Sequence, residues 1–382
     1  MGKKICFISS SRSDYGLLSG LMKQVISDKF FNFQLLVTGM HFSKEYGLTY
    51  KEIVREKIII SKKIKIFSKN DNPESILKCI EKSIPIFIKN FKSLKPSIVI
   101  LLGDRYEIIG PSIACNFLKI PIAHIHGGEV TRGSYDDITR HVVTKFSSLH
   151  FVTNSIYKKR VIQLGENPKN VHCVGSLGLE SILKQQLYSK NYIEKKLNIY
   201  FNKKNLLVTY HPATNNLKNL IFEIKQILNS LMKLKDTLII FTMPGLDEKS
   251  NLIINNINKF IKKNKNSILV KSLGQKLYFS TLKHMDGVIG NSSSGIIEVP
   301  YFNIGTINIG NRQEGRVRKI SIIDCNPQEK DIDRAINTLY KKSFIKKIQK
   351  IKITNKKTSS EIINILKRKD FKQLLPKKFY DL

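Results

Sequence analysis

Short apolar runs alternate with amphipathic segments along most of the chain. The runs Lys3–Ser9, Ser97–Leu102 and Ile120–His124 are rich in β-branched residues and end in polar or Gly-containing stretches, which is typical of buried parallel strands followed by loops. Between such runs, apolar residues recur with helical spacing, for example over residues 73–94 and 106–118. Strands that alternate with helices predict an α/β fold with a parallel, doubly wound sheet.

The alternation is interrupted at Gly175-Ser-Leu-Gly178 and then restarts. A chain of 382 residues is also too long for one small core. We therefore predict two Rossmann-like domains, residues 1–175 and 176–361, with a ligand site in a cleft between them. The elements predicted for the second domain include strands 205–209, 238–242, 268–270, 287–289 and, as the last clear strand, 306–309, with helices over 217–233 and from about Ile296.

The charge of the chain is strongly positive but unevenly distributed. The formal net charge is +35, which on its own is compatible with nucleic-acid binding. However, residues 101–141 contain four cations and five anions. The positive charge gathers instead in Lys-rich runs such as 259–271 and 341–357, and no aromatic residues interleave with basic ones in an RNA-binding pattern. We expect no nucleic-acid partner.

The cysteines and the N-terminus favour a cytoplasmic protein. The five cysteines are scattered and form no Cys-x-x-Cys pair, so we expect neither a zinc site nor disulfides. No stretch approaches the roughly 18 uninterrupted apolar residues of a membrane helix. The N-terminus runs directly into a strand-like segment without the features of a signal peptide. We expect no membrane partner.

Charged and imidazole groups follow two successive predicted strands. Gly103-Asp104-Arg105 comes after the first, and His124, His126 and Glu129 come at the end of the second, with Asp136 at the start of a predicted helix. Because the carboxyl ends of parallel strands meet at one edge of the sheet, these groups are candidates for acid–base chemistry. The alternative interpretation is a pair of ordinary strand-to-helix loops with polar caps.

A serine-rich loop in the second domain is a candidate anion site. Gly290-Asn-Ser-Ser-Ser-Gly295 joins a predicted strand to a helix, where backbone N–H groups and hydroxyls can donate to a diphosphate. No Gly-Lys-Ser/Thr follows, so this is not a P-loop. A Ser-rich helix cap is the structural alternative. Arg12, in the loop after the first strand, could clamp the same phosphate, although a polar turn explains it equally well.

Three further residues are open to both functional and structural interpretations. Glu298, after the serine-rich loop, could accept hydrogen bonds from ribose hydroxyls or simply favour the helix dipole. His211, before Pro212, could donate to a phosphate or shuttle a proton, but a lone loop histidine is more often structural. Arg312 follows the last predicted strand and could contact phosphate or solvent.

Taken together, these motifs resemble a known family. The chain is similar over nearly its whole length to the hydrolysing UDP-N-acetylglucosamine 2-epimerases of bacterial sialic-acid biosynthesis. The likeness rests on the following groups in this order: Arg12, Gly103-Asp104-Arg105, His124-x-His126-Gly-Gly-Glu129, Asp136, His211-Pro212, Gly290-Asn-Ser-Ser-Ser-Gly295, Glu298 and Gly310-Asn-Arg312-Gln313.

The resemblance implies a GT-B fold, with two Rossmann-like domains facing a central cleft and no metal or dinucleotide cofactor. It also implies a C-terminal helix, at about residues 362–382, that packs back on the first domain, and a homodimer or larger homo-oligomer. The implied reaction converts UDP-N-acetylglucosamine and water to N-acetylmannosamine and UDP, through elimination to a 2-acetamidoglucal and addition of water. The alternatives are the same chemistry on a UDP- or GDP-linked 2,4-diacetamido-2,4,6-trideoxyglucose, and a non-hydrolysing epimerase.

The resemblance also divides the candidate residues by role. One group carries the proton transfers, and a second group binds UDP. The expected catalytic residues are Asp104, His126, Glu129, Asp136 and His211. The expected UDP-binding residues are Arg12, Arg105, His211, Asn291, Ser292, Ser293, Ser294, Gly295, Glu298 and Arg312.

One position departs from several relatives of the resembled family. Where this chain has His126, those relatives have a glutamate tied to catalysis. The role of that glutamate either passes to Glu129 or is taken by an imidazole. The sequence leaves both possibilities open, and it does not say which group acts as acid and which as base.

Overall fold

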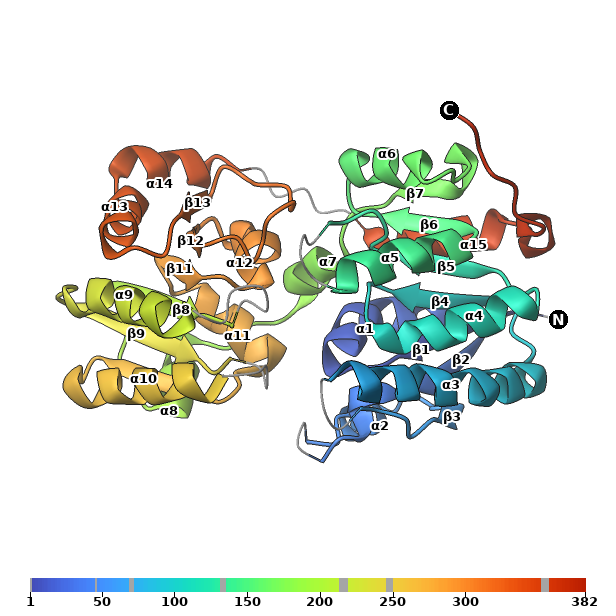
Figure 1. The fold of residues 1–382 in the computed structure, drawn as a ribbon, viewed down its shortest axis with the longest axis horizontal. Helices are drawn as coiled ribbons and strands as arrows, with labels where there is room; N and C mark the ends of the chain where they lie inside the picture. Colours follow the sequence, from blue (N-terminus) through green and yellow to red (C-terminus); the bar gives the residue numbers. More distant parts are fainter. Residues whose placement is uncertain are drawn as a thin grey trace. The chain divides into compact units, whose positions relative to one another are not determined.

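The computed structural model describes residues 2–44, 47–68, 72–130, 135–212, 219–244, 250–351 and 357–382 (Figure 1). The chain divides into two compact units. Unit 1 comprises Met1–Glu129, Ser134–Leu183 and Asn355–Leu382, and unit 2 comprises Val130–Gly133 and Lys184–Thr354. Each unit is built around its own parallel sheet, and we describe them one at a time.

Unit 1 is a doubly wound sheet whose strands, within the described residues, lie in the order β3-β2-β1-β4-β5-β6-β7. All neighbouring strands pair in parallel. The strands are β1 (Lys3–Ser9), β2 (Phe31–Val37), β3 (Lys62–Lys63), β4 (Ile98–Leu102), β5 (Ile122–Ile125), β6 (Leu149–Val152) and β7 (Val171–Cys173).

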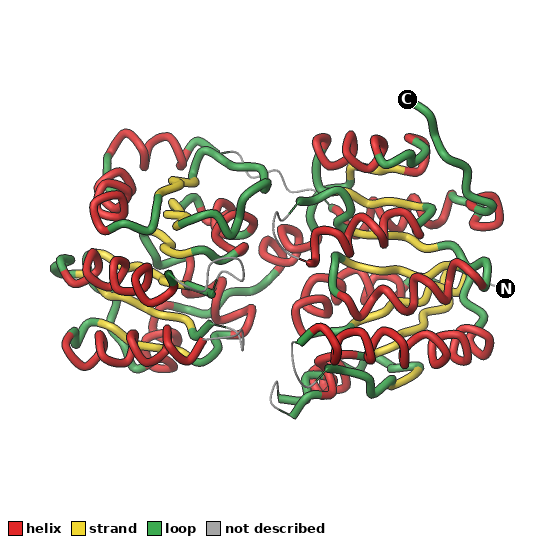
Figure 2. Tube along the Cα trace, viewed as in Figure 1, coloured by secondary structure: helices red, strands yellow, loops and turns green. Residues whose placement is uncertain are grey.

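Helices cover both faces of this sheet (Figures 1 and 2). In β1, Ile5 and Phe7 pack against α1 and α15, whereas Cys6 and Ile8 belong to the core beneath α3, α4 and α5. The strand is therefore apolar at successive positions because both of its faces are buried. The helices of unit 1 are α1 (Arg12–Ser27), α2 (Tyr50–Arg55), α3 (Pro73–Leu94), α4 (Ile109–Phe117), α5 (Tyr135–Phe146), α6 (Ser155–Gln163), α7 (Leu177–Lys184) and α15 (Thr358–Arg368).

Unit 2 contains a second doubly wound sheet, with the strand order β10-β9-β8-β11-β12-β13 among the described residues. Its strands also pair in parallel. They are β8 (Lys204–Thr209), β9 (Thr237–Thr242), β10 (Ser267–Val270), β11 (Gly287–Gly290), β12 (Gly305–Ile309) and β13 (Ile322–Cys325). The predicted strand 306–309, expected to be the last clear one, is observed as β12, and a further strand, β13, follows it. β13 reads Ile-Ile-Asp-Cys and is an incompletely buried edge strand, so it lacks the long apolar run of a central strand.

The helices α9, α10 and α13 pack on one face of the unit 2 sheet, around Ile239, Phe241 and Ile289. The prediction that a helix begins at about Ile296 was late, because α12 begins at Ser293, directly after its cap Ser292. The predicted helix 217–233 is observed from Leu220, and its first residues lie outside the described part of the chain. The helices of unit 2 are α8 (Lys190–Leu197), α9 (Leu220–Met232), α10 (Ser250–Lys263), α11 (Gly274–Leu282), α12 (Ser293–Ile297), α13 (Glu329–Leu339) and α14 (Lys342–Gln349).

The C-terminal segment lies on unit 1. Thr358 donates from Oγ1 to the carbonyl of Val174, and Ser359 donates from N and Oγ to Glu180. Instead of one helix over residues 362–382, α15 ends at Arg368 and is followed by a 3-10 turn at Phe371–Leu374 and an extended tail. No helix in the described residues is long and apolar enough to cross a membrane. The predicted pair of doubly wound parallel sheets is confirmed.

Candidate active site

The strand order of each sheet points to the place where a ligand would bind. In unit 1 the order reverses between β1 and β4, and in unit 2 it reverses between β8 and β11. Ligands of open α/β sheets bind beyond the carboxyl ends of the strands at such reversals. In unit 1 the loops at this point begin at Ser10 and Gly103, and in unit 2 they begin at Tyr210 and Asn291. All four loops carry candidate site residues.

In unit 1 the structure brings three of the expected catalytic residues together. Asp104 follows β4, whereas His126 and Glu129 follow β5. The His126 Nδ1 and Glu129 Oε1 atoms are 3.3 Å apart, and both side chains are largely buried. Arg140, on α5, contacts Asp104 Oδ2 through Nη2. Its Nη1 donates to the backbone carbonyl of His126 at 2.9 Å. We call Asp104, His126, Glu129 and Arg140 the acid–base cluster.

The loop that carries His126 and Glu129 has a constrained backbone. His126 has a left-handed φ of 67°, and its N–H donates to the carbonyl of Phe151. Gly128 has a φ of 75°, and a Cβ there would lie 2.5 Å from the carbonyl oxygen of Tyr157. Arg160 also donates to the Gly128 carbonyl at 2.7 Å. The positive φ of a non-glycine residue is uncommon, and these contacts hold it in place.

His124 is a buried structural histidine rather than a proton-transfer group. Its Nε2 lies 2.7 Å from the carbonyl oxygen of Gly103, and its Nδ1 lies 3.1 Å from Thr144 Oγ1. Burial lowers the pKa of His124 to about 3, because the charged imidazolium is disfavoured away from water. A neutral His124 joins the loop after β4 to α5. His124 therefore helps to hold the loop that carries Asp104 against α5, which carries Arg140.

Asp136, the fourth expected catalytic residue of unit 1, lies at the start of α5. It is an exposed residue in the first turn of the helix, four positions before Arg140. Residues four apart share one face of a helix, so the side chains of Asp136 and Arg140 leave α5 on the same side. Whether Asp136 takes part in catalysis remains a prediction.

The two arginines expected to bind UDP from unit 1 each contact a carboxylate. Arg12 is the first residue of α1, and its Nε lies 3.1 Å from Glu52 Oε2 on α2. Arg105 donates through Nε and Nη2 to Glu107, with an Nη2–Oε1 distance of 2.8 Å. Burial raises the pKa of Glu107, and Arg105 opposes that rise. Contact of either guanidinium with phosphate therefore stays a prediction.

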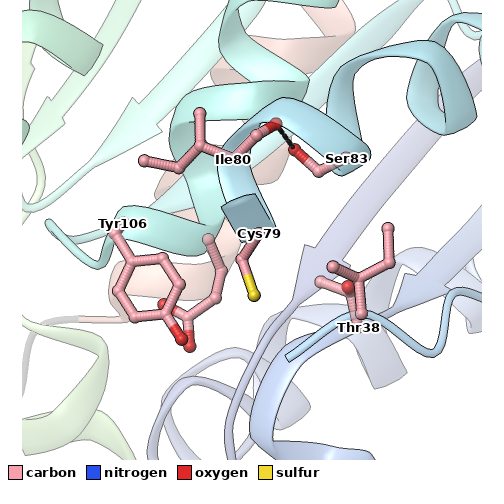
Figure 3. Close-up of a pocket in the computed structure, with 7 residues that line it drawn as sticks. Thr38, Cys79, Ile80, Ser83 and Tyr106 are labelled. Atoms are coloured by element: carbon pink, nitrogen blue, oxygen red, sulfur yellow. Dashed lines mark hydrogen bonds between the residues drawn. The ribbon is translucent and has the colours of Figure 1, made fainter. Parts of the chain in front are cut away.

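A small cavity lies beside the segment after β4, where Tyr106 and Glu107 line it (Figure 3). Its volume is about 10 Å³, room for about one water molecule and far less than the roughly 300–1,000 Å³ of most ligand pockets. None of the acid–base cluster lines it. We therefore do not assign it to the active site. The lining residues are Thr38, Ile66, Cys79, Ile80, Ser83, Tyr106 and Glu107.

In unit 2, Asn291 joins the two loops at the strand reversal. Its Oδ1 accepts from the His211 N–H at 2.7 Å, and its Nδ2 donates to the His211 carbonyl at 2.8 Å. Asn291 itself is 1% exposed. Gly290, just before it, has a φ of 141°, and a Cβ there would lie 1.9 Å from the carbonyl oxygen of Thr209. Asn291 thus fixes the position of the His211 backbone.

The residues after Asn291 form a short turn that begins α12. Ser292 caps the helix and accepts from the Ser294 N–H. Ser294 Oγ lies 2.5 Å from the Oη of Tyr278 on α11. Thr306 on β12 donates to the carbonyl of Gly295, and a Cβ at Gly295 would lie 2.7 Å from the Thr306 methyl group. Ser293 is the first helical residue. We call Asn291–Gly295 the serine loop.

Glu298 and Arg312 both lie close to the serine loop. Glu298 is the C-cap residue that follows α12, and burial raises its pKa, an effect that the hydrogen bond with the Ser294 hydroxyl partly offsets. Arg312 Nη1 and Gln313 Nε2 each donate to the Asn291 carbonyl at 3.0 Å. Gln313 is 2% exposed. These contacts anchor the segment after β12 to the serine loop.

Sequence reasoning missed two residues that organise these loops. Arg140 is one of the four cations within residues 101–141, and its spacing of four residues after Asp136 on a predicted helix was the signal available. Gln313 belongs to the Asn311-Arg-Gln-Glu run, but nothing in that run shows that its amide bonds to Asn291. Such long-range contacts are not encoded in local periodicity.

Two doubly wound parallel sheets, each with polar residues at its strand reversal, define the GT-B fold. Comparison with known protein families identifies the family to which the chain belongs. The chain belongs to the UDP-N-acetylglucosamine 2-epimerase family, whose sequence profile matches residues 23–367.

Individual relatives agree with this assignment. The chain is 42% identical over 343 residues to a GDP/UDP-N,N'-diacetylbacillosamine 2-epimerase (hydrolyzing) of Campylobacter jejuni, covering 90% of this chain and 88% of that protein. It is 36% identical to the polysialic acid biosynthesis protein P7 of Escherichia coli, covering 100% and 98%. Among solved structures, the S. aureus MnaA–UDP complex superposes with a TM-score of 0.79 at 18% identity, over 100% of both chains.

Proposed function

We propose that this protein is a hydrolysing 2-epimerase of a nucleotide-linked 2-acetamido sugar. It would release the nucleoside diphosphate and a free sugar inverted at carbon-2. The observation that carries this proposal is the 42% identity, over 90% of the chain, to a relative named as a hydrolysing 2-epimerase. The acid–base cluster supports it, because the reaction needs groups that remove and return a proton at carbon-2.

The first substrate we propose is UDP- or GDP-linked N,N'-diacetylbacillosamine, which is a 2,4-diacetamido-2,4,6-trideoxyglucose. The Campylobacter jejuni relative is named for both nucleotides. The second candidate is UDP-N-acetylglucosamine, giving N-acetylmannosamine and UDP. The family description and the 36% identity to a polysialic acid biosynthesis protein favour this alternative. A sialic-acid role follows only from the second candidate.

The chemistry divides into two balanced steps. In the first, a base removes the proton from carbon-2, the C–H electron pair forms the double bond between carbon-1 and carbon-2, and the anomeric C–O bond breaks to release the nucleoside diphosphate. In the second, water adds across this double bond. Its hydroxyl goes to carbon-1, and a proton goes to carbon-2 on the face opposite to the first removal. One proton is taken and one is returned, so no redox partner is needed.

We assign the departing diphosphate to the unit 2 residues at the strand reversal. Ser292, Ser293, Ser294 and Gly295 would supply hydroxyl and amide donors, and His211 would donate a further hydrogen bond to the charge that develops on the leaving group. Arg312 would add a cation, and Glu298 would accept from the ribose hydroxyls. Asn291 would act through His211, since its side chain bonds the His211 backbone. Arg12 and Arg105 remain proposed phosphate ligands from unit 1.

We assign the proton transfers to the unit 1 residues Asp104, His126, Glu129 and Asp136. The close approach of His126 Nδ1 to Glu129 Oε1 suggests how the role of the glutamate found in several relatives is performed here. Glu129 would orient the imidazole and stabilise its charged form, and His126 would exchange the proton with the sugar. Asp104 would serve as the partner group for the opposite face.

The proposal is tested by incubating the purified protein with UDP-N-acetylglucosamine and with UDP- and GDP-linked diacetylbacillosamine, and following each reaction by proton NMR. We expect a free 2-epimerised sugar and free nucleoside diphosphate, with the highest kcat/KM for a diacetylbacillosamine substrate. A product that still carries its nucleotide would show a non-hydrolysing epimerase. Absence of turnover on all three would overturn the proposed function. A homodimer is the oligomer we propose, and sedimentation would test it.

A further inference from the structure

Glu107 holds the guanidinium of Arg105 along one edge. Arg105 Nε lies 3.2 Å from Glu107 Oε2, and Arg105 Nη2 lies 2.8 Å from Glu107 Oε1. Nη1 forms no hydrogen bond within the part of the chain that the structure describes. The Glu107 side chain is 4% exposed, whereas that of Arg105 is 37% exposed. The inner edge of the guanidinium is therefore bound to a buried carboxylate, while its end remains accessible.

The Glu107 side chain lies where three loops of unit 1 meet. Gly39, after β2, has a φ of 62°, and a Cβ there would lie 2.6 Å from the carbonyl oxygen of Ser10 and 3.3 Å from Glu107 Cγ. Ser10 follows β1, and its N–H and hydroxyl donate to Asp14. Glu107 follows β4. Since the strand order reverses between β1 and β4, Arg105 is held at the point where a ligand is expected.

We propose that Glu107 is a positioning residue that presents Arg105 to the diphosphate of the nucleotide. This inference rests on the proposed function, in which Arg105 is a phosphate ligand, and it adds a residue to which no role was assigned. Glu107 would bind the Nε–Nη2 edge, so that the N–H groups at the end of the guanidinium face the ligand in one orientation. Arginine binds phosphate through two parallel hydrogen bonds, and this geometry requires a fixed guanidinium plane.

The other arginine–carboxylate pair in these loops lacks the features of a fixed pair. Arg12 Nε lies 3.1 Å from Glu52 Oε2, and the two side chains are 48% and 37% exposed. Exposed ion pairs of this kind contribute little to stability, whereas a buried carboxylate that loses its partner is strongly destabilised. Of the two arginines proposed to bind phosphate from unit 1, only Arg105 is therefore held in place by a buried carboxylate.

The alternative is that the Arg105–Glu107 pair serves only the stability of unit 1. In that case Glu107→Gln would lower the free energy of unfolding without changing the nucleotide affinity of the folded protein. A positioning role acts through Arg105, so its effect on affinity must vanish when Arg105 is absent. A double-mutant cycle of Glu107→Gln and Arg105→Met separates the two roles. Calorimetry with UDP and with GDP measures the affinities.

We expect Arg105→Met to weaken nucleotide binding by about 10-fold or more, as for loss of charge-assisted hydrogen bonds. Glu107→Gln should weaken it by about 3- to 10-fold, because the amide keeps one acceptor but loses the charge and the second bond. In the Arg105→Met background, Glu107→Gln should change the affinity by less than about twofold. If Glu107→Gln does not fold, Glu107→Asp takes its place, since it keeps the charge but is one methylene too short to reach both nitrogens.

Glu166→Gln is the matched control. Glu166 is a buried carboxylate of the same unit that accepts from Lys145 and His150, and it lies before β7 rather than after a strand of the reversal. The variant should lower stability without changing the affinity for UDP or GDP. If Glu166→Gln and Glu107→Gln weaken binding equally, the effect comes from stability and Glu107 is not a positioning residue.

These binding measurements do not depend on turnover. If the wild type turns over none of the sugar nucleotides but the cycle couples Glu107 to Arg105, the proposed function fails while the positioning role holds. If the sugars are turned over but a folded Glu107→Gln variant binds both nucleotides as the wild type does, the positioning role is overturned alone. Tighter binding by this variant would also overturn it, because Glu107 would then only neutralise the Arg105 charge.

Discussion

At the scale of single residues, the most informative pair is His126 and Glu129. The sequence left open which of them replaces the glutamate of several relatives. In the structure the two side chains contact each other, with Nδ1 and Oε1 3.3 Å apart. A carboxylate next to one ring nitrogen fixes the tautomer and orientation of an imidazole, while the other nitrogen exchanges protons. We therefore propose that the two residues act as one unit, with Glu129 orienting the imidazole and His126 exchanging the proton.

A double-mutant cycle tests this unit. We expect His126→Gln and Glu129→Gln each to lower kcat by about 100-fold or more. The double variant should lose little beyond the worse single variant, because residues that act together give non-additive effects. Steady-state kinetics of the four proteins gives the answer, with Glu74→Gln on the exposed first turn of α3 as a neutral control. Losses that multiply would show that the two residues act independently.

Two buried histidines make the folded state sensitive to acid. Burial lowers the pKa of His41 to about 4 and that of His124 to about 3. An unfolded chain takes up these protons near pH 6.5, whereas the folded protein stays neutral at both sites. The free energy of unfolding should therefore fall as the pH drops from 6.5 towards 4 for His41 and towards 3 for His124.

His124→Gln isolates one of these contributions. Each histidine adds a slope of about 1.4 kcal/mol per pH unit within its window. Urea unfolding of the variant between about pH 4 and 6 should accordingly give a slope smaller by about that amount. An unchanged slope would mean that His124 is protonated in the folded protein.

At the scale of elements, the point where the strand order of unit 2 reverses depends on a close approach between the backbones of β8 and β11. Gly290 ends β11 with a φ of 141°, and any Cβ would meet the carbonyl of Thr209 on β8. The Asn291 side chain then connects the ends of the same two strands through two hydrogen bonds to the His211 backbone. The serine loop begins at this point, so its position is set by the geometry of the two strand ends.

Gly290→Ala should therefore be strongly destabilising. We expect a loss of about 2–4 kcal/mol in the free energy of unfolding, from strained backbone and a steric clash. Gly20→Ala, on the exposed surface of α1 with no atom within 4 Å of the new Cβ, should instead stabilise by about 0.5–1 kcal/mol. Urea unfolding measures both. Equal effects of the two substitutions would contradict the close approach of β8 and β11.

Much of this element structure could be predicted from the sequence. The strand Lys3–Ser9 and the helix Pro73–Leu94 have the predicted bounds, because continuous apolar runs and helical periodicity are local signals. The edge strand β13 could not be predicted, since its four residues are not fully buried and include Asp324. The candidate residues could be found from their places after strands. Their partners could not, because Arg140 reaches Asp104 only through tertiary packing.

At the scale of the whole molecule, the chain is a two-unit protein of the UDP-N-acetylglucosamine 2-epimerase family. Each unit has its own sheet and its own core, and each carries polar residues at its strand reversal. The C-terminal tail belongs to unit 1. There Lys377 lies 2.7 Å from the buried Glu166, and the Tyr380 N–H donates to the Gly165 carbonyl. The tail thus contacts the last turn of α5 and the segment that follows α6.

The roles proposed for the two units predict which bond of the substrate breaks and which product receives the oxygen of water. If unit 1 removes and returns a proton at carbon-2 while unit 2 stabilises a departing diphosphate, the bond that breaks is the anomeric C–O bond, and the oxygen of water ends on the sugar. A nucleotide hydrolase that attacks phosphorus would place that oxygen on the nucleotide. The sugar carbon-2 would then keep its original hydrogen and configuration.

The most direct measurement is turnover in isotopically labelled water, with mass spectrometry and NMR of both products. In oxygen-18 water the proposed reaction places the label on carbon-1 of the released sugar and leaves the nucleoside diphosphate unlabelled. In deuterium oxide it places deuterium at carbon-2 of the inverted sugar. Label in the diphosphate, or a released sugar with its original hydrogen at carbon-2, would contradict the elimination and hydration proposed for this protein.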